Sequence, residues 1–100
     1  MKNIEWFKVK IAPRLNGYEI KYKFFEEGDF GALNLIEFNS QEMGGEIDFW
    51  STGWLGIHLV DYIGEVELLN ILIEPLQNER KEESLKRLLE LLSIEVEKWD

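Results

Sequence analysis

The stretch GEIDFWSTGWLGIHLVDY, residues 45–62, decides the fold because its pattern is typical of two strands and the turn between them. Residues 46–50 and 54–62 are rich in aromatic and β-branched side chains, which favour a half-buried strand. Residues 51–53 separate the two runs, and Gly53 can take the left-handed backbone conformation that a three-residue hairpin loop requires. This stretch therefore predicts an antiparallel hairpin.

The chain before this hairpin predicts three further strands. Residues 4–14 alternate apolar and polar side chains, as a half-buried strand does, and Asn16-Gly17 then supplies a tight turn. Residues 18–25 alternate in the same way, and residues 30–38 follow as a third strand after a turn at residues 26–29. The buried face of the first strand is expected to hold Phe7, Val9 and Ile11.

The chain after the hairpin predicts one more strand and a helix. Residues 66–73 are an almost continuous apolar run, which is typical of a strand buried on both faces. Beyond Pro75, apolar residues recur at helical spacing, and Asn78 is placed to cap the helix. The apolar stripe of this helix consists of Leu85, Leu88, Leu89, Leu92, Val96 and Trp99.

These elements together predict an α+β fold. We expect an antiparallel sheet of five or six strands, with one long C-terminal helix packed on one face and the other face partly free. A chain of 100 residues suits a single domain spanning residues 1–100. With 45% hydrophobic residues and no cysteine, its stability must come from an apolar core rather than from disulfides.

The sequence shows no targeting or membrane signal. Charges recur every few residues at the N-terminus, where a signal peptide would need an apolar stretch. No later run approaches the roughly 18 apolar residues of a membrane span. We therefore expect a cytoplasmic protein that does not engage a membrane.

Charge is unevenly distributed along the chain. Residues 26–76 contain eleven acidic residues and no lysine or arginine, whereas residues 1–25 carry a net charge of +4 and residues 77–100 one of −2. Two interpretations are open. Lysines and arginines of the flanking segments could lie beside these acids in the fold and neutralise them, or the acids could form one anionic surface that attracts a cationic protein. The overall charge of −9 argues against nucleic acid as a direct ligand.

No catalytic or metal-binding signature is present. His58 is the only histidine, and a set of Asp48, Ser51 and His58 lacks the Gly-x-Ser-x-Gly turn of serine hydrolases. The carboxyl pair of Glu46 and Asp48 is interpreted as solvated, because so small a domain has little room for a cleft that would shift their pKa. We predict that the chain is not an enzyme, binds no cofactor or metal, and has no small-molecule substrate.

Trp50 and Trp54 flank the turn of the central hairpin and allow two interpretations. A pair of aromatic rings facing each other across two strands is an ordinary way to stabilise a sheet. Tryptophans surrounded by carboxylates are also typical of protein interfaces, where the rings anchor the partner.

The C-terminal half of the chain resembles a known class of proteins. Residues 45–62, together with ELLNILIEP at residues 67–75, resemble bacterial immunity proteins encoded beside contact-dependent growth inhibition toxins. The resemblance implies a cytosolic antidote that forms a one-to-one complex with the toxic domain of a cognate effector and occludes its active site.

Many such toxins are nucleases, whose clefts are basic because their substrates are anionic, and an acidic inhibitor is the complement of such a cleft. An alternative function is that of a small acidic adaptor or regulatory binding protein. The residues expected to contact the partner are the acids and tryptophans of the middle segment, namely Glu26, Glu27, Asp29, Glu42, Glu46, Asp48, Trp50, Trp54 and Asp61.

Overall fold

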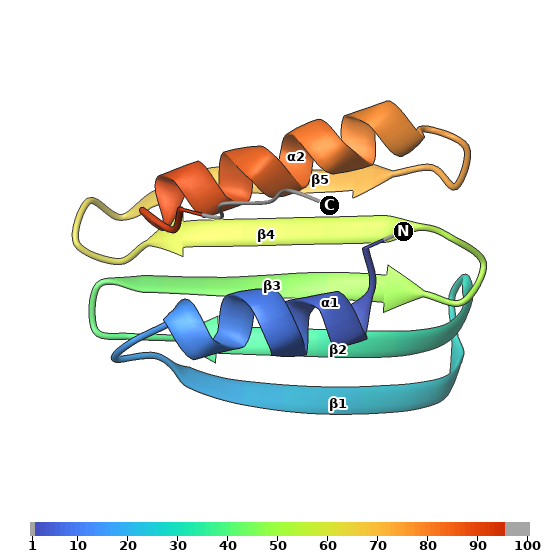
Figure 1. Cartoon of the computed structure of the whole chain (residues 1–100), viewed down its shortest axis with the longest axis horizontal. Coiled ribbons are helices and arrows are strands. Elements are labelled where there is room, and N and C mark those ends of the chain that lie inside the picture. The colour runs from blue at the N-terminus through green and yellow to red at the C-terminus, as the bar shows by residue number, and fades with distance from the viewer. Residues whose placement is uncertain (1, 96–100) are drawn as a thin grey trace.

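Five antiparallel strands form one sheet, in which each strand pairs with the next one along the chain (Figure 1). The structure is a computed structural model that describes residues 2–95. The strands are β1 (Glu19–Gly28), β2 (Gly31–Asn39), β3 (Met43–Trp50), β4 (Leu55–Asp61) and β5 (Val66–Ile73). The predicted α+β architecture, with an antiparallel sheet and a C-terminal helix, is confirmed, and the number of strands is five.

Helices cover one face of this sheet (Figure 1). At the N-terminus, α1 (Ile4–Trp6) continues into a π-helical turn (Phe7–Ile11) and a 3₁₀ turn (Ala12–Arg14). This N-terminal helical segment lies over β2 and β3, and α2 (Asn78–Leu91) lies over β4 and β5 (Figure 1). The molecule therefore has two layers, a sheet and a divided layer of helices.

The predicted strand at residues 4–14 is wrong, because this segment is helical. Phe7, Ile11 and Leu15 recur every four residues and are buried, whereas Val9, expected on the buried face, is 66% exposed. Asn3 caps α1, since its side chain accepts a hydrogen bond from the Trp6 backbone amide at 3.1 Å. The helical spacing therefore outweighs the alternation that residues 7, 9 and 11 also show.

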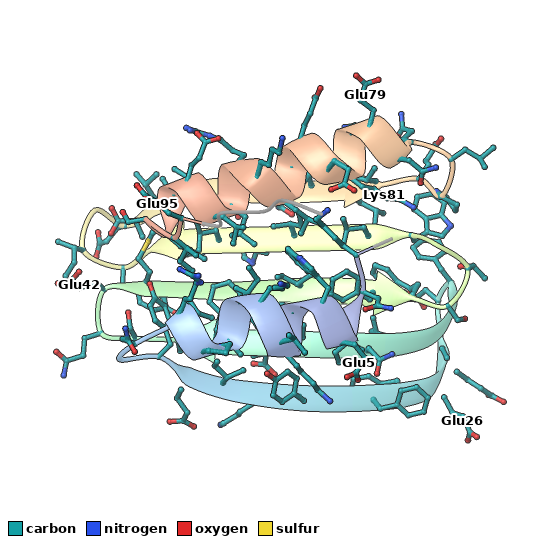
Figure 2. The ribbon with its side chains drawn as sticks, in the orientation of Figure 1. Glu5, Glu26, Glu42, Glu79, Lys81 and Glu95 are labelled. Atoms are coloured by element: carbon teal, nitrogen blue, oxygen red, sulfur yellow. The ribbon has the colours of Figure 1, made fainter. Side chains whose placement is uncertain are left out.

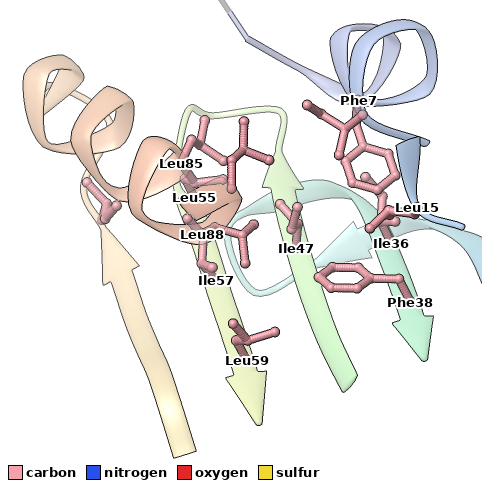
Figure 3. Packing of buried hydrophobic residues seen from close by; sticks show 13 residues of the cluster. Phe7, Leu15, Ile36, Phe38, Ile47, Leu55, Ile57, Leu59, Leu85 and Leu88 are labelled. Atoms are coloured by element: carbon pink, nitrogen blue, oxygen red, sulfur yellow. The ribbon is translucent and has the colours of Figure 1, made fainter. Parts of the chain in front are cut away.

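The core lies between the sheet and the two parts of the helix layer (Figure 3). Under the N-terminal segment, Phe7 packs on Phe38 of β2 with ring centroids 6.3 Å apart. Under α2, the apolar stripe of the helix meets β4 and β5. The fully buried side chains of the sheet are Ile36, Phe38, Ile47, Ile57, Leu59 and Ile73.

Strand β5 differs from its prediction as a strand buried on both faces. It is an edge strand covered by α2 on one side only, so Ile73 is buried whereas Val66 and Leu72 are 49% and 45% exposed. The apolar run thus reflects one covered face and one uncovered face rather than burial on both.

Helix α2 begins close to its predicted start. Asn78 is its first residue rather than its cap, and Gln77 in the cap position makes no capping hydrogen bond with its side chain. Leu85, Leu88 and Leu89 are buried as expected. The helix ends at Leu91, and the predicted positions Val96 and Trp99 lie outside the described residues.

Candidate protein-binding surface

The second face of the sheet is not covered by any helix in residues 2–95, and the strand register decides which side chains it presents. On β3, every second residue points to this side, beginning with Glu46 and followed by Asp48 and Trp50. The residues that share this side in the register are called the open face: Glu19, Lys21, Lys23, Phe25, Leu33, Leu35, Glu37, Asn39, Glu46, Asp48, Trp50, His58, Val60, Glu67, Asn70 and Leu72.

Asp48 lies at the centre of the open face. It is paired with Leu35 of β2 on one side and with Gly56 of β4 on the other, and Leu72 of β5 stands next in the same row. A Cβ atom at Gly56 would lie 3.1 Å from Asp48 Oδ2 and 3.4 Å from the Trp50 ring, so both side chains lean over this glycine. Because Gly56 has no side chain, the Asp48 carboxyl can pack close to the backbone of β4, among apolar neighbours.

This position changes the acidity of Asp48. Burial raises the pKa of its carboxyl group to about 7, and the hydrogen bond and negative charge of Glu46 add to the rise. The interpretation of this pair as solvated, with ordinary pKa values, is therefore wrong for Asp48. The carboxyl of Asp48 keeps its proton to a higher pH than an ordinary aspartate does.

Two contacting pairs of side chains, Lys23 with Glu37 and His58 with Glu67, flank this carboxyl pair. Lys23 Nζ lies 2.6 Å from Glu37 Oε1, and this hydrogen bond lowers the pKa of Glu37. On β4 and β5, His58 Nε2 lies 3.0 Å from Glu67 Oε2, and the pKa of Glu67 is lowered by hydrogen bonds from His58 and Asn70. Within residues 2–95, neither Glu46 nor Asp48 has a lysine, arginine or histidine in ion-pair contact.

Sequence reasoning did not select the four residues of these two pairs as contact residues. Alternation along a strand shows that Glu37 or His58 lies on the same side of the sheet as the residues two positions before and after it in the sequence. It does not show which residues of adjacent strands lie opposite one another. That pairing depends on the register, which places Lys21, Glu37, Glu46 and His58 in one row across the sheet.

The two layers of the molecule differ in charge. The sheet and its connections, residues 19–76, contain twelve acidic residues and only two basic ones, Lys21 and Lys23. The helix layer, residues 2–18 and 77–95, contains eight basic and six acidic residues. Since both parts of the helix layer lie on the same side of the sheet (Figure 1), the basic residues of the helices do not surround the acids of the open face.

The structure brings only some of the predicted contact residues together. Glu46, Asp48 and Trp50 share the open face of β3. Four others lie at the end of the sheet that carries the β1–β2 and β3–β4 turns, where Figure 2 labels Glu26. Two lie at the opposite end, where Figure 2 labels Glu42. The group of four is Glu26, Glu27, Asp29 and Trp54, and the group of two is Glu42 and Asp61. The expected single anionic patch is thus spread over three places.

Asp61 also has a local structural role. Its Oδ1 accepts hydrogen bonds from the backbone amides of Ile63 and Gly64, at 3.0 and 3.2 Å. This is the ordinary way in which an aspartate holds a turn. Asp61 is therefore the weakest of the predicted contact residues.

The tryptophans flanking the β3–β4 turn are connected through a third ring. Phe30 stacks on Trp54 with centroids 4.4 Å apart and meets Trp50 edge-on at 5.3 Å. Backbone hydrogen bonding between Ser51 and Ala32, at 2.8 Å, ties the two turns together. The aromatic residues therefore stabilise this end of the sheet, and they do so through Phe30 rather than as a direct pair.

Comparisons with known proteins give no match, whether with family models, with curated proteins or with solved structures. The described part of the chain contains no group of three or more His, Cys, Asp or Glu residues that could hold a metal ion. None of its helices is both long and apolar enough to cross a membrane.

Proposed function

We propose that the chain is an immunity protein that neutralises a basic toxin domain, a nuclease, by covering its active site with the open face. The observation that carries this proposal is the charge difference between the layers: the sheet layer has ten more acidic than basic residues, and its outer face is uncovered in residues 2–95. A nuclease cleft has the opposite charge because it binds phosphates.

The carboxyls of Glu46 and Asp48 are the proposed anchor. A lysine or arginine of the partner, positioned to bind a phosphate, would pair with these two groups. Within residues 2–95 neither group is in ion-pair contact with a cation, and Lys23, which attracts Glu46 at longer range, is in direct contact with Glu37. Because arginine can donate two parallel hydrogen bonds to carboxylate oxygens, it is the favoured partner residue. Its charge would also lower the pKa of Asp48 and favour release of the proton that this carboxyl holds.

Apolar side chains around this anchor supply contact area. Leu35 and Trp50 are partly buried on the open face, and Phe25 and Leu72 are 46% and 45% exposed. Protein interfaces commonly combine such an apolar centre with a charged rim. The acids at the ends of the sheet, such as Glu26 and Glu42, would act at longer range by accelerating association.

This mode of action requires no catalysis, so the protein is proposed to be a binder rather than an enzyme. A nuclease toxin attacks nucleic acid inside the cell, and an antidote to it is therefore proposed to act in the cytoplasm.

The proposal expects a toxin gene immediately upstream of this one, and the test uses the C-terminal domain which that neighbouring gene encodes. Size-exclusion chromatography with light scattering should show a one-to-one complex, and titration calorimetry should show affinity falling about tenfold or more between 50 and 500 mM NaCl. The nuclease activity of the domain should be lost in the complex. No complex at either salt concentration contradicts the proposal, and a complex that leaves nuclease activity intact points to an adaptor instead.

A matched pair of variants locates the surface. Glu46→Gln with Asp48→Asn should weaken binding by about tenfold or more, since it removes both anchoring carboxyls. Glu79→Gln with Glu83→Gln changes the same number of acids on the exposed side of α2 and should leave affinity within about twofold. Equal losses in the two double variants would show that net charge matters and the open face does not.

A further inference from the structure

A cavity of about 330 Å³ opens on the helix-covered side of the sheet, between the N-terminal residues and the start of α2. Its volume falls at the lower end of the range of small-molecule sites. It lies where the helix layer is divided, over the end of the sheet that carries the β3–β4 turn. This places it on the opposite side of the sheet from Glu46 and Asp48.

Apolar side chains form most of the lining. Phe49 and Leu55, paired across β3 and β4, line it together with Leu85 of α2. Trp54 adds an aromatic surface, and its stacking on Phe30 at 4.4 Å holds the ring in place. The cavity is thus bounded by side chains that the fold already fixes, as in most preformed ligand sites.

Two lysines line the same cavity, and their surroundings differ. Lys2 is 8% exposed and lies 2.8 Å from Glu82, so each of these charges has its counterion. Lys81 Nζ donates a hydrogen bond to the Pro75 carbonyl oxygen at 2.8 Å (Figure 2 shows Lys81 on α2). In residues 2–95 no carboxylate forms an ion pair with Lys81. Burial lowers the pKa of its amino group.

The cavity therefore has an excess positive charge in a molecule of net charge −9. An ammonium group carries three N–H donors, and the Pro75 carbonyl uses one of them. An anionic group of a ligand would supply the counterion that Lys81 lacks. A cationic ligand would be repelled by the same charge.

We propose that this cavity binds a small planar apolar molecule with one negative charge, such as an aromatic carboxylate, whose carboxylate pairs with Lys81 Nζ while its ring contacts Trp54 and Leu85. Trp50 belongs to both the cavity lining and the open face, whereas Lys81 and Leu85 belong to α2 on the other side of the sheet. The proposed ligand is bound rather than converted. The inference does not depend on the immunity function.

Three probes of equal size test the proposal on the full chain: 2-naphthoate, the neutral 2-naphthamide and the cationic 2-naphthylmethylamine. Naphthoate should bind with a Kd on the order of 0.1 to 1 mM, as expected for a compact ligand of this size. The amide should bind about tenfold more weakly, and the amine should not bind measurably. ¹H–¹⁵N NMR should show the largest shifts at the Trp54 indole and at the backbone amides of Gly53 and Lys81.

Variants at Lys81 test the proposed counterion. Lys81→Gln should abolish the preference for naphthoate over the amide, and Lys81→Arg should retain it. Lys86→Gln removes the same charge from an exposed position of α2 and should leave the preference unchanged. Equal binding of the three probes, shifts that map outside the cavity, or an unchanged preference in a folded Lys81→Gln variant would each overturn the proposal.

Discussion

The two faces of the sheet are made by the same strands but have opposite compositions. On the covered face, Ile36, Phe38 and Ile47 are at most 1% exposed and contact the helix layer. On the open face, the residues next to them along the strands are Leu35, Glu37 and Asp48, which remain partly exposed. Each strand therefore places fold-determining residues at alternate positions and leaves the intervening positions available for recognition.

This difference has a consequence for tolerance to substitution. A side chain on the covered face contacts both the sheet and a helix, so its removal leaves a cavity. A side chain on the open face contacts only its neighbours in the sheet. Substitutions of similar size on the two faces should therefore differ strongly in their effect on stability.

The largest effect is expected from Phe38→Ala compared with Leu35→Ala. Phe38 is 0% exposed and its ring contacts Phe7 and Tyr18 at centroid distances of 6.3 and 6.0 Å, so its truncation should lower the free energy of unfolding by about 3 to 5 kcal/mol. Leu35→Ala should cost about 1 kcal/mol, since this leucine is partly exposed. Urea unfolding monitored by tryptophan fluorescence measures both, and equal losses would show that the open face is covered in solution.

The N-terminal segment shows why this face pattern was only partly predictable from sequence. Phe7, Val9 and Ile11 satisfy an alternating pattern, while Phe7, Ile11 and Leu15 satisfy a helical one, and both occur in the same residues. The burial of Leu15 and the hydrogen bond by which Asn3 caps α1 both favour the helical conformation. The strands of the central hairpin were predictable because residues 45–62 contain their own turn, with Gly53 at φ +100°.

The candidate binding surface was predictable to a smaller extent. Alternation places Glu46, Asp48 and Trp50 on one side of β3, and the sequence alone supports that much. The pKa of Asp48, however, is raised mainly by burial, and the residues beside it in the sheet, Leu35, Gly56 and Leu72, come from three other strands. Such neighbours are far apart in the chain, and only the register brings them together.

A smaller effect is expected from Asp48→Asn on the dependence of stability on pH. The pKa of Asp48 is raised from its ordinary value of 3.8 to about 7 in the folded chain, so the native state holds a proton that the unfolded state has lost between these pH values. The wild type should therefore lose stability as the pH rises from about 4 to about 7, and not further above. Asparagine cannot ionise and should remove this loss.

The advantage of Asp48→Asn should be absent near pH 4 and should reach about 1 to 2 kcal/mol above pH 7, a figure reduced because solvent screens part of this carboxyl. Urea unfolding at pH 4, 6 and 8 measures the difference. Glu42→Gln replaces an exposed acid on the β2–β3 turn and serves as the control. Its difference in stability from the wild type should not grow with pH. A wild type whose stability rises steadily from pH 4 to 8 would contradict the raised pKa.

The smallest effect is expected at the edge of the open face, where His58 and Glu67 pair at 3.0 Å. The pKa of Glu67 is lowered mainly by the hydrogen bond from His58, with a further contribution from Asn70. His58→Gln should therefore move this pKa upwards, part of the way to its ordinary value.

The stability of the domain should change little, because both side chains are about half exposed and solvent screens their attraction. An NMR titration of the Glu67 side-chain carboxyl carbon in both proteins measures the shift. If the pKa of Glu67 does not change in the His58→Gln variant, the lowering does not come from His58, and Asn70 is the side chain responsible.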